Sequence, residues 1–459
     1  MTNLLQVVKI ALSRLHLLLL LVVFLFSSCR KAPTYEFDLI ISNGNVIDGS
    51  GSLWFPADLA IKGKNIVEIG KIPNKEKRAP KIINAQDLIV CPGFINLQTN
   101  SNSFIFTDDF SKNKIYQGIT SQVFVDGIPL RLTQDRKKLG IYFSELINRG
   151  ISINIGAYIG LNKIVESVLG SSKRKVNLSE ISEIKKIIHE NMIDGALGLS
   201  NSSDKLIKES MTPDELIALA DVVAKYGGRY SAFVRGNKKE IQTAIRETVR
   251  VSKEANIPTD IVNLEVTDES FFGKIEEIIK VLDKHRESVE LLTMTQAPYL
   301  ARRDDASGVP SEMQEKDVIF VLKLDWVSIR SVGRNSNLNK GMISRKIHAE
   351  SYGSFPLVLG KFVREKEISD LETVVKKMTW LNAKKLGLQN RGLIKIGNRA
   401  DITIFNPNTV NGNGATKNPQ EFSSGIQYVI VNGVLVLEAG KLLSSQPGQI
   451  LLGKGKLKE

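Results

Sequence analysis

Short apolar runs alternate with amphipathic helical patterns through the middle of the chain, and this alternation is the strongest constraint on the fold. Residues 151–155 have the pattern of a strand. Thr212-Pro213-Asp214-Glu215 begins a helix, with Thr212 as N-cap and Glu215 completing a capping box, and Gly227-Gly228 ends it. Residues 369–372 form a second capping box. The pattern predicts βα units around a parallel sheet.

Both ends of the chain are rich in β-strand patterns. Alternating apolar runs flank Asn43-Gly44, residues 62–64 and Asn432-Gly433. Asn-Gly between such runs is a strong short-range hairpin signal. Two β-rich ends around an α/β middle predict one small sheet domain that is built from both termini.

The first residues have the pattern of a lipoprotein signal. Lys9 and Arg14 precede a short apolar run, and Ser27-Ser28-Cys29 follows it. The run is too short to span a bilayer comfortably. We therefore expect residues 1–28 to be a signal peptide and 29–35 a tether, with lipid on Cys29. The alternatives are a short uncleaved anchor or a chance apolar terminus. The expected location is the periplasm-facing cell envelope.

Composition excludes some classes of function. The formal net charge is +13, but the lysines are scattered among glutamates and form no aromatic-interleaved stripe. Nucleic-acid binding favours a clustered basic patch, so no nucleic-acid partner is expected. With Cys29 lipidated, Cys91 is the remaining cysteine. A lone cysteine at the start of a strand is expected to be a small core residue.

Several segments together resemble the D-aminoacylase (N-acyl-D-amino-acid deacylase) branch of the amidohydrolase superfamily. They are residues 43–51, 91–101, 194–200, 352–356 and 391–401. The resemblance implies a (β/α) TIM-like barrel over residues 91–391. It also implies a small β-sandwich domain from residues 36–90 and 392–459. Fewer residues than usual in that family lie between residue 299 and Ser331, so we expect a barrel that is either truncated, with a strand lost, or repaired at this place.

The resemblance also places the family's metal site on this chain. The first-strand histidine pair falls on Gln98 and Asn100, and the metal-bridging residue falls on Asp126. The later histidines and the catalytic aspartate are likewise replaced, at Phe233, Asn263 and Val332.

These replacements change the chemistry expected of the site. The family uses zinc, and a catalytic zinc site needs about three protein ligands with an open position for water. Amides are weak ligands, whereas phenylalanine and valine cannot coordinate at all. Val332 also removes the family's general base. The sequence therefore predicts no cofactor and no hydrolysis by the family mechanism.

The positions that hold the substrate's carboxylate in the family have changed sign. Glu265 and Glu350 replace a lysine and an arginine there. The carboxylate of an N-acyl amino acid would be repelled by this pair. Arg235 is kept and could pair with either glutamate. His348 is the histidine nearest the expected pocket.

Two functions fit these observations. The first is a lipid-anchored pseudoenzyme that binds an unknown small ligand or an envelope protein, or has a structural role. The alternative is an active hydrolase of linear amide C–N bonds, of N-acyl-amino-acid deacylase type, with a relocated site around Asp126, Glu265, His348 and Glu350.

Overall fold

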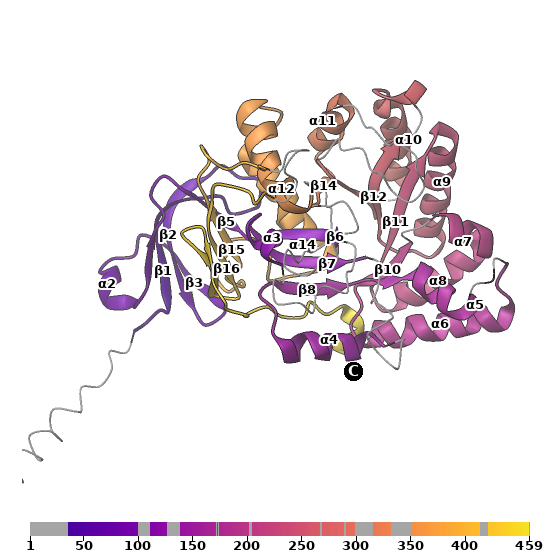
Figure 1. Ribbon diagram of the computed structural model, residues 1–459, viewed down its shortest axis with the longest axis horizontal. Helices are drawn as coiled ribbons and strands as arrows, with labels where there is room; N and C mark the ends of the chain where they lie inside the picture. Colours follow the sequence, from indigo (N-terminus) through magenta and orange to yellow (C-terminus); the bar gives the residue numbers. More distant parts are fainter. Residues whose placement is uncertain are drawn as a thin grey trace, which may run out of the picture.

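The structure is a computed structural model with a mixed α/β fold (Figure 1). It describes residues 35–99, 111–125, 138–170, 172, 174–201, 204–266, 269–288, 291–298, 315–331, 350–413 and 421–458. The segment predicted as signal peptide, with Cys29, lies outside these residues.

Parallel strands form a central barrel. One sheet has the order β6-β7-β8 and a second has the order β14-β13-β12-β11-β10-β9. A single residue separates β8 from β9, so the two act as one interrupted strand and the described strands fill the eight positions of a (β/α)₈ barrel. They are β6 (Phe94–Thr99), β7 (Ile119–Phe124), β8 (Asn154–Ala157), β9 (Ile159–Gly160), β10 (Gly198–Asn201), β11 (Arg229–Gly236), β12 (Thr259–Val266), β13 (Leu292–Gln296) and β14 (Val327–Ile329).

The alternative of a truncated barrel is wrong. The short connection between β13 and β14 still contains a helix, α11 (Glu315–Lys323), and therefore forms a complete βαβ unit. The chain has lost length between these strands without losing a strand. Asn382, on α14 (Trp380–Leu386), links the first strand to the last, because its Nδ2 donates to the carbonyl oxygens of Ile95 (2.7 Å) and Ile329 (3.3 Å).

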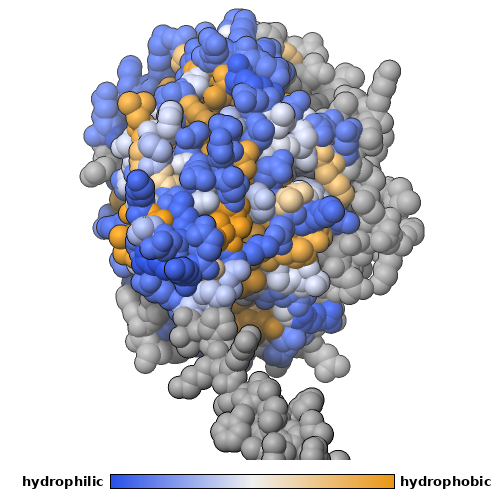
Figure 2. Space-filling view, turned by 90° about the vertical axis from the view of Figure 1, so that its left-hand side faces the viewer, coloured by the Kyte–Doolittle hydropathy of each residue, from blue (hydrophilic) through white to orange (hydrophobic). Residues whose placement is uncertain are grey.

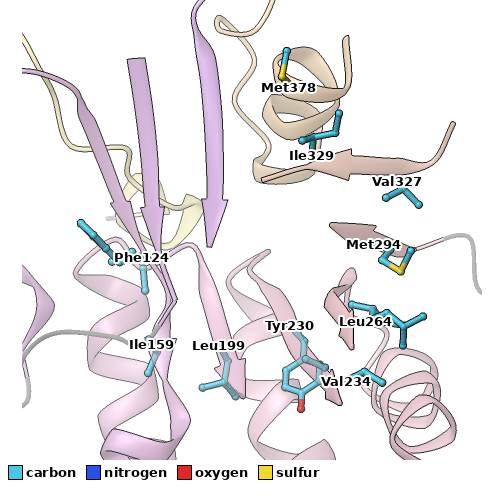
Figure 3. Packing of buried hydrophobic residues seen from close by; sticks show 14 of the residues in the cluster. Phe124, Ile159, Leu199, Tyr230, Val234, Leu264, Met294, Val327, Ile329 and Met378 are labelled. Atoms are coloured by element: carbon cyan, nitrogen blue, oxygen red, sulfur yellow. The ribbon is translucent and has the colours of Figure 1, made fainter. Parts of the chain in front are cut away.

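Helices cover the outside of the barrel, as Figure 1 shows for α5 to α11. Outward side chains of the strands, including Leu199, Val234, Leu264 and Met294, form the buried layer beneath them (Figure 3). The helices are α3 (Lys112–Ile115), α4 (Leu139–Arg149), α5 (Leu161–Leu169), α6 (Leu178–Ile193), α7 (Asp204–Ser210), α8 (Pro213–Lys225), α9 (Lys238–Glu254), α10 (Ile275–Ser288), α11, α12 (Glu350–Leu357), η3 (Val358–Glu365), α13 (Leu371–Met378) and α14 (Trp380–Leu386).

The predicted helix starts are partly confirmed. Thr212 caps α8 in a complete capping box with Glu215. The second predicted box is wrong by one position, because Asp370 and not Ser369 accepts the N–H of Thr373 at the start of α13 (2.6 Å). An ionised carboxylate at the helix N-terminus is favoured by the helix dipole as well as by this hydrogen bond.

Strands from both ends of the chain form one nine-stranded sheet to the left of the barrel in Figure 1. Its order is β18-β17-β16-β15-β5-β1-β2-β3, with β4 beside β1. A sheet shared by both ends was expected, whereas a two-layer sandwich and the domain boundaries stay predictions. The strands are β1 (Leu39–Val46), β2 (Phe55–Lys62), β3 (Asn65–Gly70), β4 (Ile82–Asn84), β5 (Ile89–Pro92), β15 (Ile402–Phe405), β16 (Ile426–Val431), β17 (Val434–Glu438) and β18 (Lys441–Leu442).

The two Asn-Gly signals have different outcomes. Asn432 and Gly433 both have positive φ and join β16 to β17 in a tight hairpin, as predicted. The hairpin predicted at Asn43-Gly44 is wrong: β1 continues through it with a register shift, and Asn43 donates its N–H to Asp58 Oδ1 (2.9 Å). The left-handed residue forms a bulge there instead of a turn.

A buried polar network joins the terminal sheet to the barrel. Arg391 and Asp401 form an ion pair in which both side chains are buried, and Asp401 Oδ1 accepts the N–H of Asn432 (2.7 Å). Asn154, on barrel strand β8, donates to Asp401 (3.1 Å) and accepts from Asn432 (2.7 Å). The arginine and aspartate at either end of the segment 391–401 therefore hold the junction together.

The surface over the terminal sheet is mixed. Figure 2 shows hydrophobic residues there in scattered patches between hydrophilic ones. Leu53 and Trp54 are among the exposed apolar residues of the chain. Within the described part of the chain, none of the helices combines the length and the apolar character needed to cross a membrane.

Candidate functional site

Five of the predicted site residues have backbones that lie toward one end of the barrel. Gln98 lies in the last two residues of β6, Phe233 and Arg235 lie in the second half of β11, and Asn263 and Glu265 lie in the second half of β12. This is the carboxyl end of the strands, where (β/α)₈ proteins carry their active sites.

Several predicted residues lie beyond what the structure describes. Asn100, Asp126, Val332 and His348 fall outside the described residues. For Gln98, Arg235, Asn263, Glu265 and Glu350 only the backbone falls within them. The backbone register sets Arg235 of β11 opposite Glu265 of β12.

Phe233 is the predicted ligand position whose side chain the structure describes. It is half-buried, and its ring centroid lies 5.9 Å from Cζ of Arg330. A hydrocarbon ring offers no lone pair to a metal, but its face attracts a cation. A guanidinium therefore lies beside the position where the resemblance puts a family histidine.

Sequence reasoning missed Arg330. It directly follows β14, and it is fully buried, with 0% of its surface exposed. Its N–H continues the strand pairing by donating to the Gln296 carbonyl (3.0 Å). The signal was an arginine directly after the short strand Val327-Ser328-Ile329, at a position whose strand parity points inward.

The amino end of the barrel strands, which we call the floor of the barrel, holds a second buried cation. Lys385, on α14, donates from Nζ to Asp260 Oδ1 (2.8 Å), the Met294 carbonyl (2.7 Å), Thr295 (3.0 Å) and Ser328 (2.8 Å). Burial raises the pKa of Asp260, but Lys385 and the threonine hydroxyls outweigh it, so the net shift is downward. Burial lowers the pKa of Lys385 to about 8. The pair lies at the amino end of β12, where polar groups serve stability more than catalysis.

Another polar cluster lies outside the strands, between the barrel and α3. Ser331 donates from its hydroxyl to Gln117 Oε1 (3.1 Å), accepts from Lys114 Nζ (3.3 Å), and donates its N–H to Asn96 Oδ1 (2.8 Å). All four side chains are buried. The cluster fixes the end of β14 against β6 and so positions the residue before it, Arg330.

The remaining cysteine and two of the histidines have ordinary surroundings. Cys91 is fully buried in the core, as expected, and burial raises the pKa of its thiol. His189 Nδ1 lies 2.5 Å from the Tyr226 hydroxyl on the outer helices. His285 is in the last turn of α10. Neither is near the carboxyl end of the barrel strands.

The described residues do not make a histidine-type metal centre. No group of three or more histidine, cysteine, aspartate or glutamate side chains among them could hold an ion. At the positions compared with the family, oxygen ligands remain at Asp126 and at the amides Gln98, Asn100 and Asn263. This donor set does not fit a zinc centre that depends on imidazole nitrogen.

The fold and the position of the site define a (β/α)₈-barrel protein with its site at the carboxyl end of the strands. A family model described as the amidohydrolase family matches residues 312–437. The relatives below support the same superfamily, and the solved structures below share its fold.

The chain is similar along almost its whole length to deacylases of that superfamily. It is 26% identical to the D-aminoacylase of Alcaligenes xylosoxydans xylosoxydans, over 92% of this chain and 99% of the relative. It is 24% identical to the N-acyl-D-aspartate deacylase of the same organism, over 93% and 97%. A crystal structure of D-aminoacylase superposes with a TM-score of 0.81 at 24% identity, covering 90% of this chain and 99% of that one.

The expectation of no cofactor is contradicted by the metal-dependent relatives. One solved D-aminoacylase has a binuclear metal centre, and it superposes with a TM-score of 0.80 at 23% identity over 90% of this chain and 99% of that one. The N-acyl-D-glutamate deacylase of Bordetella bronchiseptica is complexed with zinc and superposes with a TM-score of 0.80 at 22% identity over 91% and 100%. At the positions where the resemblance puts the family's histidines, this chain has Gln98, Asn100, Phe233 and Asn263, so a metal bound there would need other ligands.

Proposed function

We propose that this chain is a hydrolase of linear amide C–N bonds, of the N-acyl-amino-acid deacylase type, with a site that differs from those of its relatives. The observation that carries the proposal is the similarity to D-aminoacylase over 92% of this chain and 99% of the relative. In the reaction, water adds to the acyl carbonyl and the C–N bond breaks. The products are a carboxylic acid and a free amine.

The proposed site lies at the carboxyl end of the barrel and is relocated relative to the family's metal centre. Its polar groups are Asp126, Glu265, His348 and Glu350. Glu265 is near the end of β12 and Glu350 begins α12, so their backbones belong to that end of the fold. Carboxylate and amide oxygens suit harder divalent cations better than zinc. Such an ion, when bound, would polarise the acyl carbonyl.

A binding or structural role without hydrolysis is the second candidate. The half-buried ring of Phe233 and the valine at position 332 favour it, because they remove a ligand and a base of the family mechanism. The active relatives do not favour it. The two candidates separate cleanly by experiment.

The test uses the purified full chain. Its metal content is measured, and N-acetyl-D-amino acids are incubated with it after addition of Mg²⁺, Mn²⁺ or Zn²⁺. Release of the free D-amino acid, lost on chelation and restored by one ion, is the expected result. Absence of hydrolysis with every ion, together with retained ligand binding, would instead establish the second candidate.

We also propose that the chain is an envelope lipoprotein anchored through Cys29, facing the periplasm. The support is the order of Lys9 and Arg14, the apolar run and the small residues before the cysteine. Palmitate labelling of the wild type but not of Cys29→Ala is expected. Labelling that persists in Cys29→Ala would exclude this anchor.

A further inference from the structure

Alternate residues at the end of β14 face opposite sides of the barrel wall. Ser328 contacts Lys385 inside the barrel, whereas Ile329 packs outward in the core beneath the helices (Figure 3). Arg330 then lies inside, beside Phe233, and Ser331 lies outside with Gln117. This is the period of two that a strand imposes. The guanidinium is therefore inside the barrel.

Arg330 lies above the floor of the barrel. It is two residues beyond Ser328 along the strand, a rise of about 6–7 Å toward the carboxyl end. The floor cation, Lys385, is already engaged by Asp260 and its neighbours. Arg330 therefore lies nearer than Lys385 to the carboxyl end of the strands, which is the end where a (β/α)₈ protein binds its substrate.

The ring of Phe233 gives this guanidinium an aromatic neighbour. Phe233 is half-buried, so part of this residue is open to solvent next to a cation that is itself fully buried. A guanidinium beside an aromatic face keeps its N–H edges for acceptors in its own plane. That geometry suits a carboxylate, which arginine binds through two parallel hydrogen bonds.

The sequence leaves a need for such a cation, because the positions that bind the carboxylate in the family have changed sign. Glu265 and Glu350 occupy the positions that are cationic in the family, so they would repel a substrate carboxylate. An N-acyl amino acid must still be held by its carboxylate if this chain cleaves it. Arg330 offers a positive charge inside the same end of the barrel.

We propose that Arg330, beside Phe233, is the residue that binds the carboxylate of an N-acyl amino acid substrate in this barrel. This inference rests on the proposed function for the identity of the substrate. Arg330 is not one of the positions to which the family pattern assigns a role. Since a guanidinium carries five N–H donors, Arg330 can bind an acceptor of the protein and a substrate carboxylate together.

The test measures binding, so it does not depend on turnover. The probes are N-acetyl-D-leucine, N-acetyl-D-aspartate and N-acetyl-D-glutamate, together with N-acetyl-D-leucinamide, which lacks the α-carboxylate. Affinities are measured by calorimetry for the wild type, Arg330→Gln and Arg330→Lys. Arg246→Gln, an exposed arginine on α9, is the matched control. Thermal unfolding checks that each variant is folded.

We expect at least one carboxylate probe to bind the wild type, and N-acetyl-D-leucine to bind at least tenfold more tightly than its amide. Arg330→Gln should abolish that preference and leave amide binding unchanged, while Arg330→Lys keeps part of it and Arg246→Gln keeps all of it. Failure of every carboxylate probe to bind the wild type, or an undiminished preference in a folded Arg330→Gln protein, would overturn the proposal. Where Arg330→Gln does not fold, a folded Arg330→Lys protein decides: a reduced preference for the carboxylate supports the proposal, and an undiminished preference overturns it. Tight, Arg330-dependent binding without hydrolysis would overturn the proposed function alone.

Discussion

Lys385 Nζ lies 2.8 Å from Asp260 Oδ1 at the floor of the barrel, and both side chains are almost completely removed from solvent (3% and 2% exposed). Lysine comes from α14, after the last barrel strand, and aspartate from the start of β12. The pair therefore connects α14, which closes the floor of the barrel, to the amino end of β12 in the barrel wall. Removing either residue would leave the other as an unpaired buried charge, which strongly destabilises the folded state.

Replacing the lysine should destabilise the fold strongly. Lys385→Met leaves the Asp260 carboxylate buried without its cation, and we expect the free energy of unfolding to fall by about 3–5 kcal/mol. Denaturant unfolding measures the change. Lys384→Met, on the same helix, is the control, and the double variant Asp260→Asn with Lys385→Met should recover part of the loss. An unfolding free energy of Lys385→Met within about 1 kcal/mol of wild type would contradict this account.

A second buried lysine should make stability depend on pH. Lys377 Nζ donates to the carbonyls of Leu322 (2.7 Å) and Leu324 (2.9 Å), and burial lowers its pKa to about 8 from the model-peptide value of 10.5. Between these values the unfolded chain binds more protons than the folded one, so raising the pH through this window stabilises the fold, by up to about 1.4 kcal/mol per pH unit.

Lys377→Met isolates that contribution. The difference in unfolding free energy between wild type and variant, measured from pH 7.5 to 10, should change with pH in the direction just given. Lys376→Met, on the same helix, should follow the wild type. A pH-independent difference for Lys377→Met would mean that its pKa is not lowered.

The last segment of the chain packs along the base of the barrel, near α4 and α6 (Figure 1). Gly448 donates its N–H to the Ile151 carbonyl (2.7 Å), and a Cβ on it would lie 2.3 Å from the Ile153 carbonyl oxygen. Gly448→Ala should therefore lower the unfolding free energy by about 1–3 kcal/mol. Ser444→Ala, at an exposed position, should change it by less than about 0.5 kcal/mol. Equal melting temperatures for the two variants would refute the close packing.

Local signals in the sequence predicted local structure well. The capping box at Thr212 and the hairpin at Asn432-Gly433 depend on residues that are neighbours in the chain. Asn43-Gly44 misled because the same left-handed residue serves a bulge when β2 pairs on both sides of it. The pairing of β1 with β2 decides whether a bulge or a turn forms at this position.

The interior of the barrel could not be predicted in the same way. Lys385 finds Asp260 across 125 residues, and Arg330 meets Phe233 across almost a hundred. No sequence pattern predicts a contact between residues at either of these separations. The family resemblance located Phe233 but gave no reason to expect a cation beside it. Three-dimensional closure of the barrel creates both relationships.

The most direct test of hydrolysis at the proposed site compares wild type with Asp126→Asn. Both purified proteins receive the same divalent ion, and the rate of free D-amino acid release from N-acetyl-D-amino acids is measured. We predict release by the wild type and a loss of at least about a hundredfold in a folded Asp126→Asn protein, since an anionic oxygen of the site becomes an amide. No release by the wild type with any ion, or equal rates for the two proteins, would contradict it.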